Sequence, residues 1–275
     1  MSTTTTTAAA SPRRDIRSTG TGARIGAGTR PGRLAVGIAR IGHEVRGYFR
    51  SPDTVFFTFL FPFIMLGIFT AAFSASGEIQ PGPGAESISV GAYYLPGLLA
   101  AGILLSGVQN LAIDIAGEKS DGTLKRLGGT PLSPVSYFLG KIGQVFVTGT
   151  LQAALLLVAA ATVFGIALPT EPEAWVTFAW VFVLGITASA LLGIALSSVP
   201  RSGKSASAVV VPIMLVLQFI SGVYLQFSQL PEWMQNLASL FPLKWMAQGM
   251  RAVFLPDDFA VLEQNEAWDL GWVAL

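Results

Sequence analysis

The chain has 275 residues and a formal net charge of +1, with 52% hydrophobic and only 12% charged residues. Soluble domains usually hold about 25% charged residues, so this composition excludes an ordinary soluble domain and indicates a membrane protein. The sequence contains no Cys, which excludes disulfides and thiolate metal sites.

Residues 1–33 contain a run of Thr, several Gly and scattered Arg, with little apolar material to bury. This composition predicts a disordered cytoplasmic tail. The pair Arg13-Arg14 is typical of twin-arginine export signals, but neither an apolar stretch nor a small-residue cleavage site follows within reach. An export signal is therefore disfavoured.

Residues 34–51 predict an amphipathic helix that lies in the inner headgroup layer of a membrane. Its apolar side chains recur at steps of three and four, and its charged side chains lie largely elsewhere on the helical wheel. The apolar set is Leu34, Ile38, Ile41, Val45 and Tyr48, and the charged set is Arg33, Arg40, His43, Arg46 and Arg50. The helix could be a simple anchor or could move with a cytoplasmic partner. Pro52 is expected to end it.

Five later segments are long and apolar enough to span a bilayer, because about 20 helical residues cross its hydrocarbon core of roughly 30 Å. They cover approximately residues 54–73, 93–113, 142–166, 174–199 and 206–227. Residues 268–275 are similar to the start of a sixth span, and so few residues cannot cross a membrane. The predicted fold is an all-α membrane protein, a polytopic helical bundle with a sixth span truncated at the C-terminus.

The distribution of basic residues predicts the orientation. With the N-terminus in the cytoplasm, the inner segments hold 15 of the 17 Lys and Arg residues, and the outer segments hold only Lys244 and Arg251. Cytoplasmic loops carry such an excess of positive charge. We therefore expect a multi-pass protein of the cell (plasma or inner) membrane with a cytoplasmic N-terminus.

The hydrophilic segment 117–133 has more structure than a simple chain reversal needs. Gly122-Thr123 can begin a short helix that places Leu124 and Leu127 on one face, with Lys125 and Arg126 toward solvent. Ser133 is a suitable N-cap, with Pro134 at the first helical position, so the next helix should begin there. The segment therefore offers a partner a surface to bind, although a solvated turn without a partner stays an alternative.

Two stripes of side chains follow within the predicted spans. Gln144, Thr148 and Gln152 recur every four residues and must face protein or water, so they either line a translocation path or bond a neighbouring helix. Small residues form the second stripe, which permits close packing of helices: Gly185, Ser189, Gly193 and Ser197.

Residues 229–254 contain two short stretches, opened by Pro231 and Pro242 and carrying Trp233 and Trp245. Each stretch is too short to span the membrane. They predict either a re-entrant hairpin at the outer face or a plain amphipathic cap on the bundle.

No catalytic, cofactor-binding or metal-binding residues are predicted. The only histidine, His43, lies outside the spans, so no intramembrane Ser-His pair or histidine metal cluster can form. Asp114 and Glu118 are one helical turn apart, and their place beside Lys119 favours a structural ion pair over a catalytic carboxylate pair. Gly203-Lys204-Ser205 is not expected to bind phosphate, because Ser198 stands where a phosphate-binding loop requires Gly.

Taken together, these segments resemble the ABC-2 type transporter permeases. The resemblance covers about residues 34–275 and rests on the order and spacing of short motifs. They are Glu44 with Arg46, Arg50, Pro52 and Pro62; Glu118, Gly122, Thr123, Leu124, Leu127, Thr130, Pro131, Leu132, Ser133, Gly140 and Lys141; and Ser221-Gly222, Leu230-Pro231, Phe241-Pro242 and Arg251.

The resemblance implies a permease that pairs with a second permease, the same or different, and with two copies of a separate ATPase that holds ATP and Mg²⁺. The segment after the second span would insert into the ATPase, which assigns coupling to Glu118, Gly122, Thr123, Leu124, Leu127, Thr130, Pro131 and Leu132. It also implies an outer gate formed by Pro231, Trp233, Pro242 and Trp245. The bilayer is the remaining partner, and no nucleic acid is expected.

The function expected from this resemblance is ATP-driven export by a subunit that is not itself an enzyme. An amphipathic substrate such as an antibiotic or a lipid-like compound is preferred, because the predicted spans contain no buried charged residue to bind a charged group. Export of cell-surface polysaccharide or lipid is the alternative. A partner-free scaffold or channel is the competitor from another class.

Overall fold

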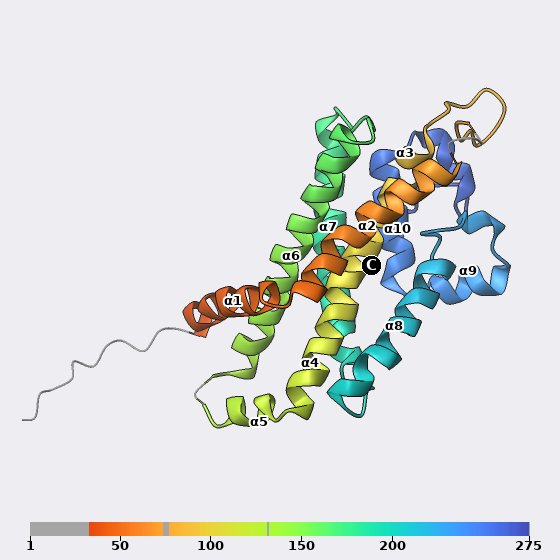
Figure 1. The fold of residues 1–275 in the computed structure, drawn as a ribbon. Coiled ribbons are helices and arrows are strands. Elements are labelled where there is room, and N and C mark those ends of the chain that lie inside the picture. The colour runs from red at the N-terminus through yellow and green to blue at the C-terminus, as the bar shows by residue number, and fades with distance from the viewer. Residues whose placement is uncertain (1–32, 74–76, 131, 275) are drawn as a thin grey trace, which may run out of the picture.

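The computed structural model describes residues 33–73, 77–130 and 132–274 (Figure 1). The predicted disordered tail, apart from Arg33, lies outside these residues. The regular structure in the described part is helical except for one antiparallel bridge between Ile79 and Ile88. Together with the long apolar helices, this content confirms the predicted all-α membrane fold.

Five helical segments of the described chain are long and apolar enough to cross a membrane. They are α2 (Pro52–Phe73), the run Val90–Ser120, α6 (Pro134–Thr162), α7 (Pro172–Leu196) and α8 (Gly203–Ile220). The run consists of α3 (Val90–Leu104), a π-helical segment η2 (Leu105–Asn110) and α4 (Leu111–Ser120). The shorter elements are α1 (Arg33–Phe49), α5 (Thr123–Gly128), η3 (Phe227–Gln229), α9 (Glu232–Ala238), α10 (Pro242–Phe254), η4 (Asp257–Leu262) and α11 (Leu270–Val273).

The α3-η2-α4 run forms the centre of the bundle. Its most apolar window is 72% buried, whereas that of α2 is only 17% buried although it is more apolar. The central run contacts α2, α6, α7, α8 and α10 along its length. A lipid-facing helix must be apolar on its exposed side, so the exposed apolar surface of α2 fits a position at the bilayer.

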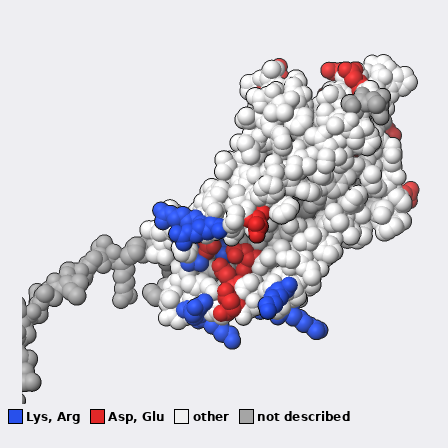
Figure 2. Space-filling model, viewed as in Figure 1, with Lys and Arg blue, Asp and Glu red and all other residues white. Residues whose placement is uncertain are grey.

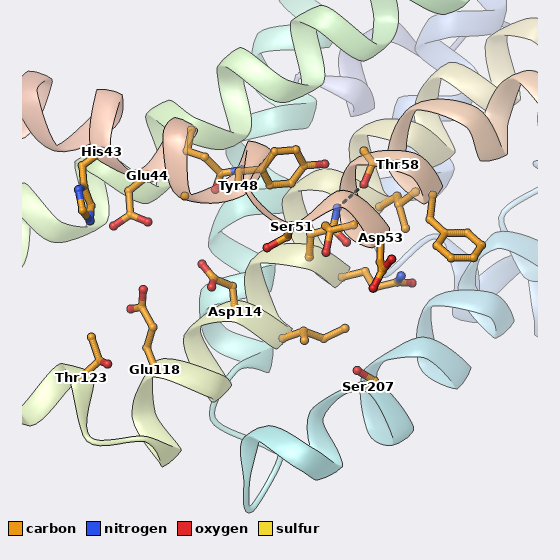
Figure 3. A pocket seen from close by; sticks show the side chains of 18 of the residues that line it. His43, Glu44, Tyr48, Ser51, Asp53, Thr58, Asp114, Glu118, Thr123 and Ser207 are labelled. Atoms are coloured by element: carbon orange, nitrogen blue, oxygen red, sulfur yellow. Dashed lines mark hydrogen bonds between the residues drawn. The ribbon is translucent and has the colours of Figure 1, made fainter.

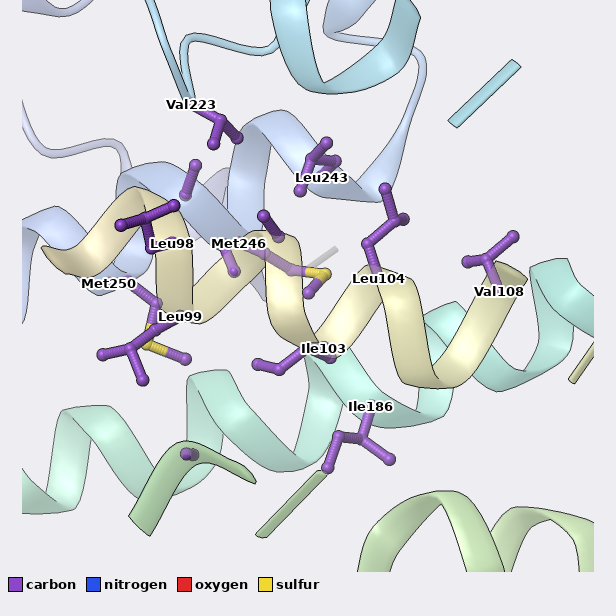
Figure 4. Close-up of a cluster of buried hydrophobic side chains, with 14 of the residues drawn as sticks. Leu98, Leu99, Ile103, Leu104, Val108, Ile186, Val223, Leu243, Met246 and Met250 are labelled. Atoms are coloured by element: carbon purple, nitrogen blue, oxygen red, sulfur yellow. The ribbon is translucent and has the colours of Figure 1, made fainter. Parts of the chain in front are cut away.

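The apolar core lies where α3, α7 and α10 meet (Figure 4). Leu98, Leu99 and Leu104 of α3 are at most 2% exposed, and Met246 and Met250 of α10 pack beside them. Lipid tails are as apolar as these side chains, so contact between helices in a bilayer depends on van der Waals packing more than on exclusion of water.

Small residues bring η2 and α7 together, as the stripe on α7 predicts. A Cβ at Gly193 would collide with the carbonyl oxygen of Gly107, and a Cβ at Gly107 would lie 2.6 Å from the Cβ of Ser189. The backbones can therefore approach only because side chains are missing at this crossing. Gly185, about two turns before Gly193, packs against the side chain of Met246 in α10.

Helix α1 crosses α6 near one end of the bundle (Figure 1). Ile38 is 66% exposed and points away from the protein, as a side chain inserted into lipid would. The side of α1 that packs on α6 is mixed, because a Cβ at Gly140 would lie 2.5 Å from Cγ of Arg40 and a Cβ at Gly143 would collide with the side chain of Ile41. Ile41, predicted on the apolar face toward the membrane, therefore packs on α6. Glu44 on this side is only 8% exposed. The charged side of this helix is therefore partly a protein contact.

Helices α9 and α10 form the region predicted as an outer hairpin, and α10 enters the bundle. It contacts α3 and α7, and most of its residues are buried. Pro242 occupies its first turn and Phe241 its N-cap position, so the proline starts the helix without losing a hydrogen bond. This packing favours a helix inserted among the spans over a plain cap on the bundle.

Candidate functional site

The segment after α4 lies at one end of the molecule, the end nearer to α1 (Figure 1). Gly122 adopts a left-handed backbone with φ 79°, which glycine tolerates, and α5 begins at the next residue. The Asp121 carboxylate accepts a hydrogen bond of 2.8 Å from the Thr123 amide. The hydrogen bonds from Thr123 hold the pKa of the exposed Asp121 carboxyl below its usual value. The predicted short helix is therefore confirmed.

The exposed face of α5 is basic and its other face is apolar. Lys125 and Arg126 are exposed, whereas Leu124 and Leu127 are half-buried. Thr130 closes the helix with a hydrogen bond of 2.7 Å to the carbonyl of Leu127. Leu132 is also half-buried, and Pro131 lies outside the described residues.

The next helix begins where the sequence predicts it. The Ser133 hydroxyl accepts a hydrogen bond of 3.1 Å from the Ser136 amide, and Pro134 follows at the first helical position. Helix α6 therefore starts at Pro134 and not near residue 142. Lys141 therefore lies within α6, about two turns after its start.

A buried ion cluster joins α1, α4 and α6 directly behind α5. The Lys141 ammonium, which is fully buried, donates hydrogen bonds to Glu44 Oε2 (2.8 Å), Asp114 Oδ2 (2.5 Å) and Glu118 Oε1 (2.7 Å). Three carboxylates from two other helices thus converge on one cation. A buried ion cluster holds its helices in one arrangement, because removing one partner leaves uncompensated charge.

Two further side chains complete the cluster. Arg40 forms an ion pair of 2.5 Å with the second oxygen of Glu44, and the Tyr137 hydroxyl donates a hydrogen bond of 2.6 Å to Glu118. Glu118, predicted as a coupling residue, therefore lies near the end of α4, just before α5. The structure brings it together with Glu44, Arg40 and Tyr137, which the sequence analysis did not connect with it.

This geometry corrects two expectations. Asp114 and Glu118 each take part in a structural ion pair, as predicted, but the cation is Lys141 and not Lys119. The premise that the spans contain no buried charged residue is wrong, because Lys141 is fully buried within α6. Both errors arise from starting the third span after Lys141, since hydropathy alone treats the preceding polar turns as a loop.

The three carboxylates of the cluster lie close enough together to hold a metal ion. Oxygens of Glu44, Asp114 and Glu118 all lie within 4.8 Å of one another. The Lys141 ammonium already contacts each of these carboxylates, so a metal would have to displace a fully buried cation. The cluster is therefore better described as an ion-pair network than as a metal site.

A cavity of about 730 Å³ opens beside the cluster (Figure 3). Helices α1, α2, α4, α5 and α8 line it together with η2, and its polar lining includes Asn110, whose amide donates a hydrogen bond of 2.8 Å to Thr58. Leu127 of α5 and Gln144 of α6 also reach its wall. The cavity therefore lies between α5 and the long apolar helices.

The predicted polar stripe on α6 is divided: Gln144 lines the cavity, whereas Thr148 and Gln152 face other helices. Thr148 is fully buried, and its hydroxyl lies 3.3 Å from the Ser106 hydroxyl of η2. Gln152 is 4% exposed, and its side-chain amide lies against Gly102 of α3. The Thr148 contact is a bond between neighbouring helices. A role of the stripe in translocation stays a prediction.

The predicted outer gate residues lie in the α9-α10 region. Pro231 precedes α9, and Trp233, 64% exposed, points away from the protein. Trp245 of α10 donates a hydrogen bond of 2.8 Å to the Ser239 carbonyl and stacks on Trp272. Their role as a gate stays a prediction.

Sequence reasoning missed a second ion pair behind this region. Arg251 contacts Glu263 at 2.5 Å and donates a hydrogen bond of 3.0 Å to the Gly222 carbonyl. Both charged side chains are less than 10% exposed. Sequence periodicity does not indicate this pair, because Glu263 follows the 3-10 helix η4 and lies outside the regular elements.

Basic side chains mark one end of the molecule. Figure 2 shows Lys and Arg at the end that holds α1 and α5, with Asp and Glu in the hollow between them, and further Asp and Glu at the opposite end. Gly203-Lys204-Ser205 lies at the start of α8, where Ser202 and Ser205 exchange hydrogen bonds in a capping box. This segment is therefore the capped start of a helix.

Comparison with known proteins agrees with this architecture. The sequence profile of a family described as "ABC-2 family transporter protein" matches residues 83–274, a region that includes α5, Lys141 and α10. The "Probable multidrug ABC transporter permease YbhR" of Escherichia coli (strain K12) is 26% identical over 205 residues, 70% of this chain and 54% of that protein.

A second relative is similar over a shorter region. The "Inner membrane transport permease YadH" of Escherichia coli (strain K12) is 24% identical over 163 residues, 59% of this chain and 62% of that protein. The chain therefore spans about half to three-fifths of the length of these relatives.

Proposed function

This chain belongs to the ABC-2 transporter family, and we propose that it is the membrane permease of an ATP-binding cassette exporter whose ATP is hydrolysed by a separate subunit. It is a multi-pass membrane transport protein. The observation that carries the proposal is the position of α5. This short helix lies at one end of the molecule. It follows α4, whose Glu118 belongs to the ion cluster that joins α1, α4 and α6.

The end of the molecule with α5 faces the cytoplasm in this proposal, as does the N-terminus. The gathering of Lys and Arg at that end supports this orientation, because cytoplasmic segments carry the positive excess. An ATPase in the cytoplasm would then meet α5 first.

Docking on the ATPase uses the two faces of α5 differently. Leu124 and Leu127 give apolar contact area, and the exposed Lys125 and Arg126 pair with acidic groups at the rim of the ATPase groove. Two copies of the ATPase and a second permease, either another copy of this chain or a different one, complete the transporter. The chain itself then needs no nucleotide site.

Movement of the ATPase reaches the spans through the ion cluster. Glu118 is in the last turns of α4, directly before α5, so displacement of α5 displaces its carboxylate. Lys141 binds this carboxylate and Glu44 of α1 at the same time, and it belongs to α6. The three helices therefore move together when the ATPase closes. This is a rigid-body route with named contacts.

The proposed substrate is a drug-like amphipathic compound that moves outward. The absence of buried charges no longer supports this choice, because Lys141 is buried. The choice now rests on the name of the relative YbhR, a probable multidrug permease. Deleting the chain should lower resistance to amphipathic drugs. Altered surface polysaccharide or lipid with unchanged resistance would contradict this choice and favour the alternative exporter.

Copurification tests the exporter assignment. The wild-type protein, solubilised in detergent from its own cells, should bring down a separate ATPase that mass spectrometry identifies. Leu124→Asp/Leu127→Asp should lose the ATPase while the membrane amount is unchanged. The matched control is Leu237→Asp/Leu240→Asp in the outer region, where these leucines are 41% and 78% exposed.

The possible results separate the proposal from its competitor. Retention of the ATPase by the control and its loss from the α5 variant are expected. Absence of an ATPase from the wild type as well would contradict the exporter and favour a partner-free scaffold or channel.

A further inference from the structure

The cavity beside the ion cluster has the size of a small-molecule site. Its volume is about 730 Å³, within the range of roughly 300–1,000 Å³ typical of ligand pockets. Ligands of this size are usually held by apolar walls with a few polar groups that fix their orientation. The cavity has such walls in Phe57, Leu105, Ile113 and Val211, which come from α2, η2, α4 and α8.

The charged lining of the cavity is unbalanced. Glu44, Asp53, Asp114 and Glu118 line it, and among the described side chains Arg40 on its wall and Lys141 behind it oppose these carboxylates. Four negative charges against two positive ones leave an excess of two negative charges at pH 7, where His43 is counted as neutral.

The four carboxylates lie on two sides of the cavity. Glu44, Asp114 and Glu118 gather on one side in Figure 3, and Asp53 projects from α2 on the other. Asp53 forms no ion pair with the described residues. The side chain of Asp114, although bonded to Lys141, is still 52% exposed. Two carboxylates thus remain accessible to an occupant.

We propose that this cavity binds a lipophilic organic cation, with Asp53 as the main counter-charge, Asp114 as the second and Phe57 as an apolar and aromatic contact. Asp53 and Phe57 are both exposed, so a cation can reach the carboxylate and the aromatic ring and is held there by charge attraction and cation–π contact. An anion of the same shape would meet the excess negative charge and bind weakly. This inference names the substrate class of the proposed exporter and takes its biological meaning from that function.

Inorganic cations fit the cavity less well. A divalent ion seeks several oxygen ligands within about 2.6 Å, and the converging carboxylates are already occupied by Lys141. Asp53 on the other side is a single carboxylate beside apolar walls. Such an environment matches a bulky cation with one delocalised charge.

The test compares two ions of nearly the same shape and opposite charge, tetraphenylphosphonium and tetraphenylborate. The full chain is placed in phosphatidylcholine nanodiscs, and binding is measured by equilibrium dialysis with empty nanodiscs as background. Wild-type protein should bind tetraphenylphosphonium saturably and at least about tenfold more tightly than tetraphenylborate.

The Asp53→Asn substitution isolates the counter-charge, because Asp53 takes no part in the ion cluster. It should weaken tetraphenylphosphonium binding by about three- to tenfold, and it should reduce the salt dependence of binding. The matched control Glu173→Gln removes a carboxylate from the exposed start of α7 and should leave binding unchanged.

Three results would overturn the proposal: equal binding of both ions, no saturable binding of either, or unchanged discrimination in Asp53→Asn. ATPase copurification is scored on the same preparations. Cation binding without a copurified ATPase would support the cation site and contradict the exporter assignment. An ATPase without charge discrimination would keep the exporter and remove the cation site.

Discussion

Replacing Lys141 by Met should detach α1 from the bundle. Met nearly preserves the length of the side chain but removes the charge that three carboxylates share. Removing one partner of a buried ion pair costs about 3–5 kcal/mol, because the other charge stays buried without compensation. The lower end applies here, since Asp114 is half-exposed and Arg40 still pairs with Glu44. We therefore expect a loss of about 3 kcal/mol.

Hydrogen exchange measured by mass spectrometry can locate this loss. Undocking of α1 from α6 limits exchange of its inner amides, so 3 kcal/mol corresponds to roughly 100-fold faster exchange in peptides from Arg33–Phe49. Adding Glu118→Gln should restore part of the protection, because less negative charge is then unpaired. Peptides of the central α3 should change much less.

The control substitution is Lys204→Met, which removes an exposed lysine at the start of α8 on the same side of the molecule. Exposed substitutions usually change stability by less than about 0.5 kcal/mol. Unchanged exchange of α1 in Lys141→Met would refute the reasoning. So would an equal effect of Lys204→Met.

Three further substitutions test other contacts. Gly193→Ala should destabilise by about 1–3 kcal/mol in detergent unfolding because its Cβ meets η2, whereas Gly47→Ala has free space and should be neutral or slightly stabilising. Arg251→Met should lower the midpoint of unfolding, since Glu263 is left buried and unpaired at a cost of about 3–5 kcal/mol. The pKa of Asp121 is lowered in the folded protein, so the stability that its carboxylate gives to the start of α5 is fully present above the ordinary carboxyl pKa. This stability is lost as pH falls through the lowered pKa, and hydrogen exchange of α5 should be faster at acidic pH.

The sequence predicts the elements whose signal is local. Long apolar runs indicate the five candidate spans, and Ser133-Pro134 marks the start of α6 because a cap and a first-turn proline act within a few residues. The short helix α5 follows equally from Gly122 and the spacing of two leucines. Each of these features is decided by residues close together in the chain.

The sequence does not predict the ion cluster, because its contacts are long-range. Glu44 and Lys141 are 97 residues apart, and Asp114 and Lys141 are 27 apart. Positive residues near span ends are usually explained by membrane orientation, which hides a lysine that is buried in a helix contact. The inward side of α1 was missed for the same reason, since Arg40 and Glu44 have charged types typical of a solvated face.

The most direct test of the central claim is to ask what α5 touches in the native membrane. A photo-crosslinking amino acid is introduced at Leu124, and in a separate control at Leu240, which is 78% exposed in the outer region. Adducts formed under light are then identified by mass spectrometry. The account predicts an adduct with an ATP-binding subunit from position 124 and none from position 240. No ATP-binding adduct from 124, or equal adducts from both positions, would contradict it.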